Sequence, residues 1–292
     1  MVCFALAALA TPTMAAGKLM DWPDLLGRPM PKATRELAYG SLPDQVADLW
    51  LPVGKGPFPV VLMVHGGCWQ SGVAKLSIMN YAAEDLRQRG IAVWNIEYRG
   101  IDRLGGGYPG TFQDVAAGAD KLATVATDFH LRVGHVVAFG HSAGGHLALW
   151  LAARGRLPAG NALKAARPLP IAAVVSSGGL PDLEAVRAGG FCGEGTVDRL
   201  VGAPSATHPH VFADTSPAEL GVGKDRATLI SGDQDQIAPP SLADAYAAKM
   251  KHKGAAIEAV TVPGAGHVEL ISPGTAAWSV TVRTIQRLLS AP

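Results

Sequence analysis

The sequence predicts one α/β domain with a mostly parallel central sheet and helices on both faces. Short apolar runs, typical of buried strands, alternate along the chain with longer stretches of helical periodicity. No internal repeat and no break in composition interrupts this alternation between residues 17 and 292. Strands that alternate with helices form parallel sheets joined by right-handed crossovers, so we expect a single sheet.

The composition excludes several classes of protein. The 292 residues are 48% hydrophobic and 17% charged, which indicates a globular chain rather than a disordered one. A net charge of +1 without a basic run argues against a nucleic-acid partner. The three cysteines lie far apart and have no zinc-type spacing. We therefore expect neither a metal nor an organic cofactor.

The N-terminus resembles a secretory signal. Residues 1–16 are apolar and end in small residues, with a cleavage site expected near Ala15 or Ala16. This run is too short for a secure membrane span. We therefore expect export to the periplasm or the medium, with the cytoplasm as the alternative, and no stable membrane insertion. Cleavage would remove Cys3 and leave Cys68 and Cys192, which are hypothesised to pair in an oxidising compartment.

Two strands are expected before the first fully buried run. Residues 17–58 are rich in Pro and Gly, and within them residues 35–39 and 46–51 are strand-like. We interpret these pieces as the opening antiparallel strands of the sheet. The continuous apolar run at residues 60–64 then predicts a strand buried on both faces.

Helices and strands follow in turn to the C-terminus. Residues 76–89 have apolar side chains at helical spacing and stop at Gly90, which ends the predicted helix. A Gly-rich loop at residues 104–110 lacks the register of a dinucleotide site and is expected to shape the substrate pocket. Residues 183–222 are interpreted as an irregular excursion that lines the pocket. The other expected strands are residues 91–96, 136–139, 171–176, 227–231 and 256–262, and the other expected helices are 114–126, 241–253, 276–289 and the helix after residue 142.

The stretch Gly-His-Ser-Ala-Gly at residues 140–144 organises the predicted site. It lies between an apolar strand and an apolar helix, which is the context of a nucleophile elbow. A turn this tight leaves no room for side chains two residues before and after the serine, and Gly140 and Gly144 have none. We predict that Ser142 Oγ is exposed at the carboxyl edge of the sheet, where the next helix directs its N–H groups at an anion.

A second glycine loop, HGGCW at residues 65–69, follows the first buried strand. Two glycines let the backbone approach a ligand closely with free N–H groups. We expect the oxyanion hole to involve Gly66, Gly67 and Cys68, together with Ala143 just after the serine. The amides of Gly67 or Cys68 and of Ala143 are the expected donors.

His267 is the predicted base. It follows the last strand in a Gly-rich loop, from which it can reach Ser142. His65 and His141 lie inside the tight motif loops and are expected to brace the backbone. The other histidines lie on the helix after the serine, near surface turns or in the excursion: His146, His130, His135, His252, His208 and His210.

Three aspartates compete for the role of the acid. Asp235 begins the D-x-x-x-P pattern that usually carries the acid after this strand, and it is preferred. Asp233 is interpreted as a turn former. Asp182 follows the preceding strand, a position that serves as a variant. In the predicted mechanism, His267 takes the proton of Ser142, and the acid fixes the tautomer of the histidine.

Taken together, the motifs HGGCW, EYR, GHSAGG, GDQDxxxP and GAGH resemble the α/β-hydrolase superfamily, in its esterase/lipase branch with an HGG oxyanion loop. The resemblance spans roughly residues 45 to 290 and implies the α/β-hydrolase fold. HGGxW followed by GHSAGGHLA is similar to kynurenine formamidases and to small acetyl and feruloyl esterases. The sequence departs from the formamidase pattern at Cys68, where an aromatic residue is common.

The resemblance implies a serine hydrolase that cleaves small-molecule carboxylic esters with short acyl groups. The alternative is an arylformamidase that hydrolyses amides of the N-formylkynurenine type. A peptidase is disfavoured because the similar peptidases carry a large extra domain, for which this chain has no room. A non-catalytic binding protein is disfavoured because such proteins typically lack a residue of the triad, whereas Ser142, Asp235 and His267 are all present here. The sequence leaves the natural substrate and the oligomeric state open.

Overall fold

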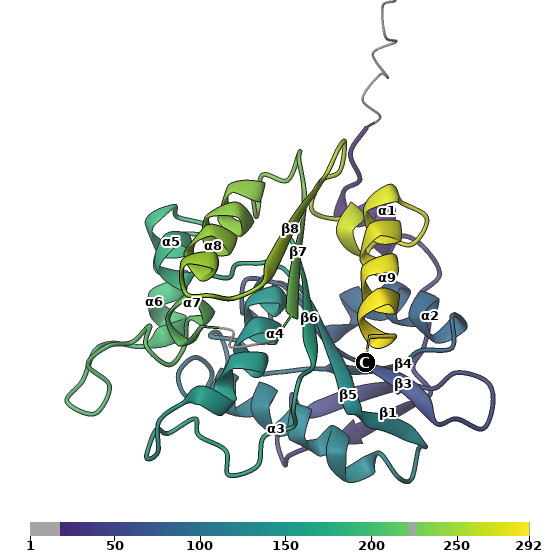
Figure 1. Ribbon diagram of the computed structural model, residues 1–292, viewed down its shortest axis with the longest axis horizontal. Coiled ribbons are helices and arrows are strands. Elements are labelled where there is room, and N and C mark those ends of the chain that lie inside the picture. Colours follow the sequence, from purple (N-terminus) through teal and green to yellow (C-terminus); the bar gives the residue numbers. More distant parts are fainter. Residues whose placement is uncertain (1–17, 222–225, 292) are drawn as a thin grey trace, which may run out of the picture.

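A computed structural model describes residues 18–221 and 226–291 (Figure 1). The predicted signal peptide, residues 1–16, lies outside the described residues. The described chain forms an eight-stranded sheet in the order β1-β2-β4-β3-β5-β6-β7-β8. The strands are β1 (Arg35–Ala38), β2 (Val46–Trp50), β3 (Phe58–Val64), β4 (Ala92–Ile96), β5 (Leu131–His141), β6 (Ala173–Ser177), β7 (Arg226–Gly232) and β8 (Ile257–Val262).

The first two strands pair antiparallel, and β2 is also antiparallel to β4. Strands β3 to β8 are all parallel. Both the mostly parallel sheet and its antiparallel opening pair are as predicted. Because β3 is central, its side chains alternate between two buried cores, with Val60, Leu62 and Val64 on one face and Val61 and Met63 on the other.

Helices cover both faces of this sheet, as predicted. Figure 1 shows α2 (Asn80–Gln88) and α9 (Ala276–Leu289) on one face, with α1 (Trp22–Leu26) beside them. On the other face lie α3 (Gly110–Val125), α4 (Ala143–Ala153) and α8 (Pro240–His252). The larger core is under α3, α4 and α8, and the smaller core is under α1, α2 and α9.

The segment at residues 183–222 is more regular than predicted. It contains α5 (Leu183–Ala188), α6 (Thr196–Val201) and α7 (Pro217–Leu220). Each helix is too short to show a clear apolar period, so composition alone indicated a loop. Asp182 caps the first of them by accepting from the N–H of Glu184 at 3.2 Å.

Other boundaries also shift. The helix predicted at residues 114–126 begins four residues earlier, because Thr111 and Phe112 are fully buried in its first turn. The helix predicted at residues 76–89 opens with a 3₁₀ turn, η1 (Leu76–Met79). Two further 3₁₀ turns are η2 (Arg154–Arg156) and η3 (Glu269–Ile271). Among the described residues, no helix is both long and apolar enough to cross a membrane.

Candidate active site

Ser142 occupies a strained turn between β5 and α4. Its φ is 56° and its ψ is −125°, a conformation that costs energy for any residue with a side chain. A Cβ at Gly140 would lie 2.0 Å from the carbonyl oxygen of Gly144, and a Cβ at Gly144 would lie 2.1 Å from that of Val64. Both positions therefore require glycine, for the steric reason inferred from the sequence.

His267 lies in the loop after β8 and is hydrogen-bonded to Asp235. Its Nδ1 is 2.6 Å from Asp235 Oδ2. The other carboxylate oxygen, Oδ1, accepts from the N–H groups of Ile237 at 2.8 Å and Ala238 at 2.9 Å. These three bonds fix the orientation of a carboxylate that is only 1% exposed. The arrangement holds the histidine with Nδ1 protonated and Nε2 free to accept a proton.

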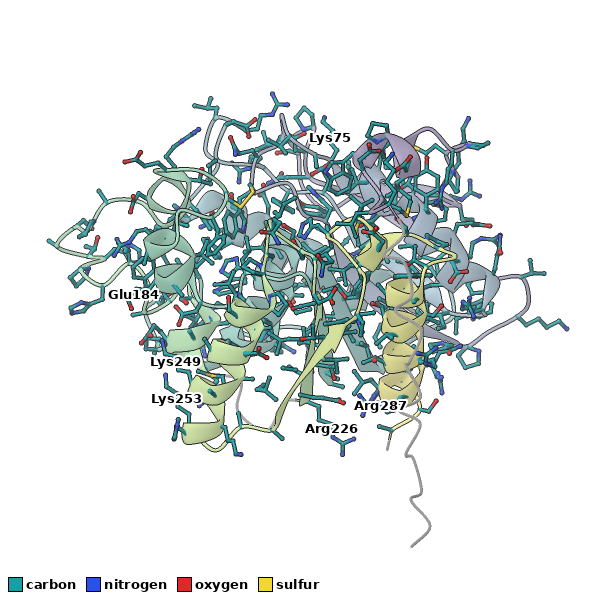
Figure 2. The ribbon with its side chains drawn as sticks, turned by 90° about the horizontal axis from the view of Figure 1, so that it is seen from above. Lys75, Glu184, Arg226, Lys249, Lys253 and Arg287 are labelled. Atoms are coloured by element: carbon teal, nitrogen blue, oxygen red, sulfur yellow. A yellow bond between two sulfur atoms is a disulfide. The ribbon has the colours of Figure 1, made fainter. Side chains whose placement is uncertain are left out.

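The two competing aspartates lie elsewhere. Asp233 Oδ1 accepts from the N–H of Gly264 at 2.7 Å, which is the turn-forming role expected for it. Asp182 caps α5 and is paired with Lys249 of α8 at 2.9 Å. Lys249 is labelled in Figure 2. Of the three candidates, the structure places only Asp235 against His267.

Ser142 and His267 border one pocket of about 360 Å³. Gly67 and Cys68 of the second glycine loop also line it. No hydrogen bond joins the N–H groups of Gly67, Cys68 or Ala143 to another described residue. Gly67 and Cys68 line the pocket, whereas Ala143, at the start of α4, is fully buried and does not line it. The remaining lining side chains are apolar: Trp22, Leu26, Val73, Ala74, Ile78 and Ile237.

Gly66 has a steric role in the same loop. It does not line the pocket, but a Cβ at this position would lie 2.8 Å from Ser142 Cβ. The next non-glycine residues, Cys68 and Trp69, have φ angles of 51° and 55°. Strained left-handed residues of this kind are typical of functional loops that the surrounding structure holds in place.

A buried ion pair braces this loop from below. His65 Nδ1 donates to the carbonyl oxygen of Gly66, and His65 Nε2 lies 2.7 Å from Glu97 Oε1. Burial alone would raise the pKa of Glu97, but His65 and the N–H groups of Leu76 and Tyr98 outweigh it and hold that pKa below its usual range. The Tyr98 ring stacks on the His65 ring at 4.3 Å. The EYR motif thus supports the HGG loop.

His141 braces the loop that carries His267. Its Nε2–H donates to the carbonyl oxygen of His267 at 3.1 Å. Complete burial, together with the neighbouring His267, lowers the pKa of His141 well below its ordinary value. His141 is therefore neutral at physiological pH. The expectation that His65 and His141 brace the backbone is confirmed by these contacts.

His146 of α4 anchors the other end of the HGG loop. Trp69 Nε1–H donates to His146 Nδ1 at 3.2 Å, and His146 Nε2–H donates to the carbonyl oxygen of Thr215 at 2.9 Å. Burial lowers the pKa of His146 to about 4. The neutral ring is required here, because a protonated Nδ1 cannot accept the indole N–H.

The free energy of unfolding is expected to decrease as the pH is lowered, because of His146. Its folded pKa of about 4 lies below the unfolded value of about 6.5, so the unfolded chain binds the proton first. The contribution is complete above pH 6.5 and decreases as the pH falls toward 4, by about 2 kcal/mol at pH 5. Urea unfolding of wild type and His146→Gln between pH 5 and 8 measures it. The amide retains an acceptor and a donor, so the variant should show a flatter pH dependence; equal slopes would contradict the assignment.

Two segments expected to form the pocket do not line it. The loop at residues 104–110 instead stacks Tyr108 on His208 at 3.9 Å, and the Tyr108 hydroxyl donates to Asp214. This contact ties the Gly-rich loop to the excursion at residues 183–222. None of the pocket-lining residues comes from either segment. The excursion is joined to the HGG loop by the bond of Cys192 to Cys68 and, through His146, by the carbonyl oxygen of Thr215.

Cys192 forms a disulfide with Cys68, which confirms the hypothesised pairing. Their Cα atoms are 5.5 Å apart, and 124 positions separate them in sequence. The bond is drawn in yellow in Figure 2. It ties the loop between α5 and α6 to Cys68, which lines the pocket.

The sequence analysis missed the pocket residues contributed by the N-terminal segment. Trp22 and Leu26 belong to α1, which was not predicted. A signal for this helix is present in the sequence: Asp21 and Asp24 form a capping box around Pro23 at the first turn. With only five residues, the helix shows no apolar period that could have identified it.

A protein-family model named BD-FAE matches residues 47–250. The chain belongs to the BD-FAE family. This is an esterase family of the α/β-hydrolase type, so the chain is a carboxylic-ester hydrolase by family, and the resemblance drawn from the motifs is confirmed. The matched residues of this BD-FAE member include Ser142 and Asp235, whereas His267 and α1 lie outside them.

Solved structures share the fold of this BD-FAE member at low sequence identity. A truncated carbohydrate esterase from gut microbiota is 20% identical with a TM-score of 0.71, over 89% of this chain and 98% of its own. Esterase Est2 of Thermogutta terrifontis is 20% identical with a TM-score of 0.69, over 89% and 92%. A bacterial heroin esterase is 22% identical with a TM-score of 0.66, over 87% and 83%. No curated protein matches the chain significantly.

Proposed function

We propose that the protein hydrolyses small neutral carboxylic esters with short acyl groups, through an acyl-enzyme on Ser142. The observation that carries the proposal is the shared pocket. Ser142 at its strained turn and His267 in its bond to Asp235 border one pocket, together with the free N–H groups of the second glycine loop. These are the parts that acyl transfer to a serine requires.

The mechanism follows from their chemistry. His267 Nε2 takes the proton of Ser142 Oγ as the oxygen attacks the ester carbonyl, and Asp235 stabilises the imidazolium. The N–H groups of Gly67 or Cys68 and of Ala143 hold the oxyanion of the tetrahedral intermediate. His267 then gives the proton to the leaving alcohol. A water molecule activated by the same histidine releases the acid and restores Ser142.

The pocket supports the choice of substrate class. Its volume of about 360 Å³ is at the lower end for ligand sites, and its lining side chains apart from Ser142, His267 and Cys68 are apolar. A charged group would lose its hydration there without finding a partner. Two structures of Thermogutta terrifontis Est2 are described with propionate and with butyrate bound, and we infer short acyl groups for this chain as well.

We also propose that the protein works outside the reducing cytoplasm. The disulfide between Cys68 and Cys192 supports this location, because such bonds persist in oxidising compartments. It agrees with the signal peptide expected at residues 1–16.

Active-site labelling and a substrate panel test the proposed function. We expect a fluorophosphonate to attach to Ser142, identified by peptide mass, and to abolish hydrolysis, because the base that activates the serine toward esters also activates it toward phosphorus. The wild type should cleave p-nitrophenyl acetate and butyrate with higher kcat/KM than N-formylkynurenine. A higher kcat/KM for the formamide would favour the arylformamidase alternative. Labelling at another residue, or none in folded protein, would refute the role of Ser142.

A further inference from the structure

We propose that residues 19–26, the N-terminal wall, determine the specificity of the Ser142 pocket by limiting the size of the apolar group that an ester places there. The inference rests on the proposed ester hydrolysis at Ser142 and extends it to a substrate class: neutral esters whose apolar group fits between this wall and the opposite side of the pocket. The wall contributes two of the six apolar lining side chains, Trp22 and Leu26.

Trp22 lies directly beside His267, the proposed base, and His141, which braces its loop. Its ring meets His267 edge-on at 6.5 Å between centroids and His141 at 6.2 Å. A group bound next to His267 therefore lies against the indole. A large, rigid side chain with two rotatable bonds sets a fixed limit to the space, since shifting it would also disturb the packing against both histidine rings.

Buried contacts hold the wall in place. Leu25 is fully buried in the core shared with α2 and α9. The N–H of Met20 donates to Glu269 Oε1 at 2.5 Å, and the N–H of Gly266 donates to Glu269 Oε2 at 3.1 Å. Because Gly266 precedes His267, the buried carboxylate of Glu269 joins the wall to the loop of the base. The wall therefore keeps a fixed position relative to the reacting atoms.

The mouth of the pocket is apolar and exposed. Leu26 is 40% exposed, Ile237 42% and Val73 63%, and all three line the pocket. Exposed large apolar side chains gathered around a pocket indicate a surface that a ligand covers. The mouth offers no charged side chain to a substrate among the described lining residues. An apolar group on the ester gains free energy by covering this apolar surface, whereas a charged group would lose its hydration there.

The wall also lies outside the part of the chain that the family shares. The BD-FAE model matches residues 47–250, which supply Ser142, Asp235 and the HGG loop. Residues 19–26 precede that region and still reach the pocket. The wall therefore adds its limit on substrate size from outside the matched region, opposite lining residues that lie within it.

Truncation of the wall tests the inference. We would measure kcat/KM of wild type, Leu26→Ala and Trp22→Ala on p-nitrophenyl acetate, butyrate and octanoate, which vary the acyl group. Acetates of ethyl, hexyl and benzyl alcohols vary the leaving group. For each variant we compare the kcat/KM of the largest substrate of a series with that of the smallest. In the series whose variable group lies against the wall, this ratio should rise about tenfold in Leu26→Ala and in Trp22→Ala, because pocket space for one methylene group or more changes discrimination by this much. Leu26→Trp should lower the same ratio.

Leu104→Ala is the matched control, because Leu104 is fully exposed and does not line the pocket. It should leave every ratio unchanged. If Trp22→Ala does not fold, Leu26→Ala and Leu26→Trp decide, since Leu26 is partly exposed. If the variants hydrolyse p-nitrophenyl acetate as fast as wild type and the ratios are unchanged in both series, the wall does not determine specificity. Absence of ester hydrolysis by the wild type would instead refute the proposed function.

Discussion

Replacement of Asp235 by asparagine is expected to lower kcat for p-nitrophenyl acetate about 10⁴-fold. The carboxylate accepts from His267 Nδ1 at 2.6 Å and is held by two backbone N–H groups. An amide keeps the shape but can present its NH₂ to Nδ1, which favours the tautomer protonated at Nε2. That tautomer cannot take the proton of Ser142. Steady-state kinetics between pH 6 and 9 measure the loss.

The chain provides two matched controls for this substitution. Asp233→Asn and Asp182→Asn also alter aspartates that follow strands of the sheet, and both were candidates for the acid. Asp233 holds a turn at Gly264, and Asp182 caps α5 and pairs with Lys249. Both variants should keep kcat within a few-fold of wild type, because neither carboxylate contacts His267. If Asp182→Asn instead lowered kcat 10³-fold or more and Asp235→Asn left it unchanged, the acid would be Asp182 rather than Asp235.

The parts of the site that sequence reasoning located are those with a local steric cause. The turn at Ser142 requires glycine at 140 and 144, because a Cβ at either position would collide with backbone oxygens. Such a requirement leaves a pattern within five residues of sequence. The D-x-x-x-P pattern at Asp235 is equally local, since its carboxylate accepts from the N–H groups two and three residues later.

The parts that it missed have no local cause. Trp22 meets His267 although 245 positions separate them, and Ile78 reaches the same pocket from the turn before α2. They come close together because α1 and α2 pack on the same face of the sheet, and no short sequence pattern indicates that packing. The opposite error at residues 104–110 has the same origin. Glycines predicted a loop there correctly, but the contact between Tyr108 and His208 directs that loop away from the pocket.

Removal of the disulfide by Cys192→Ser is expected to lower the free energy of unfolding by about 5 kcal/mol. The bond closes a loop with 124 positions between its ends, and in the chain-entropy model a closed loop of this length restricts the unfolded chain strongly. Urea unfolding of wild type and variant, each without reductant, measures the difference. Wild type in excess dithiothreitol should reproduce the variant's stability, and the variant should not respond to dithiothreitol. Equal stability of oxidised wild type and variant would contradict the expected contribution.

The same variant is expected to affect catalysis, because Cys192 is bonded to Cys68, a residue in a left-handed conformation that lines the pocket. Loss of one oxyanion donor costs about 10²-fold in kcat. The loop keeps two other anchors, the bond from Trp69 to His146 and the pair of His65 with Glu97. A fall in kcat at a temperature where the variant is fully folded would assign the positioning of the Cys68 N–H to the disulfide. An unchanged kcat would assign it to those two anchors, and the disulfide would then stabilise the fold without organising the oxyanion hole.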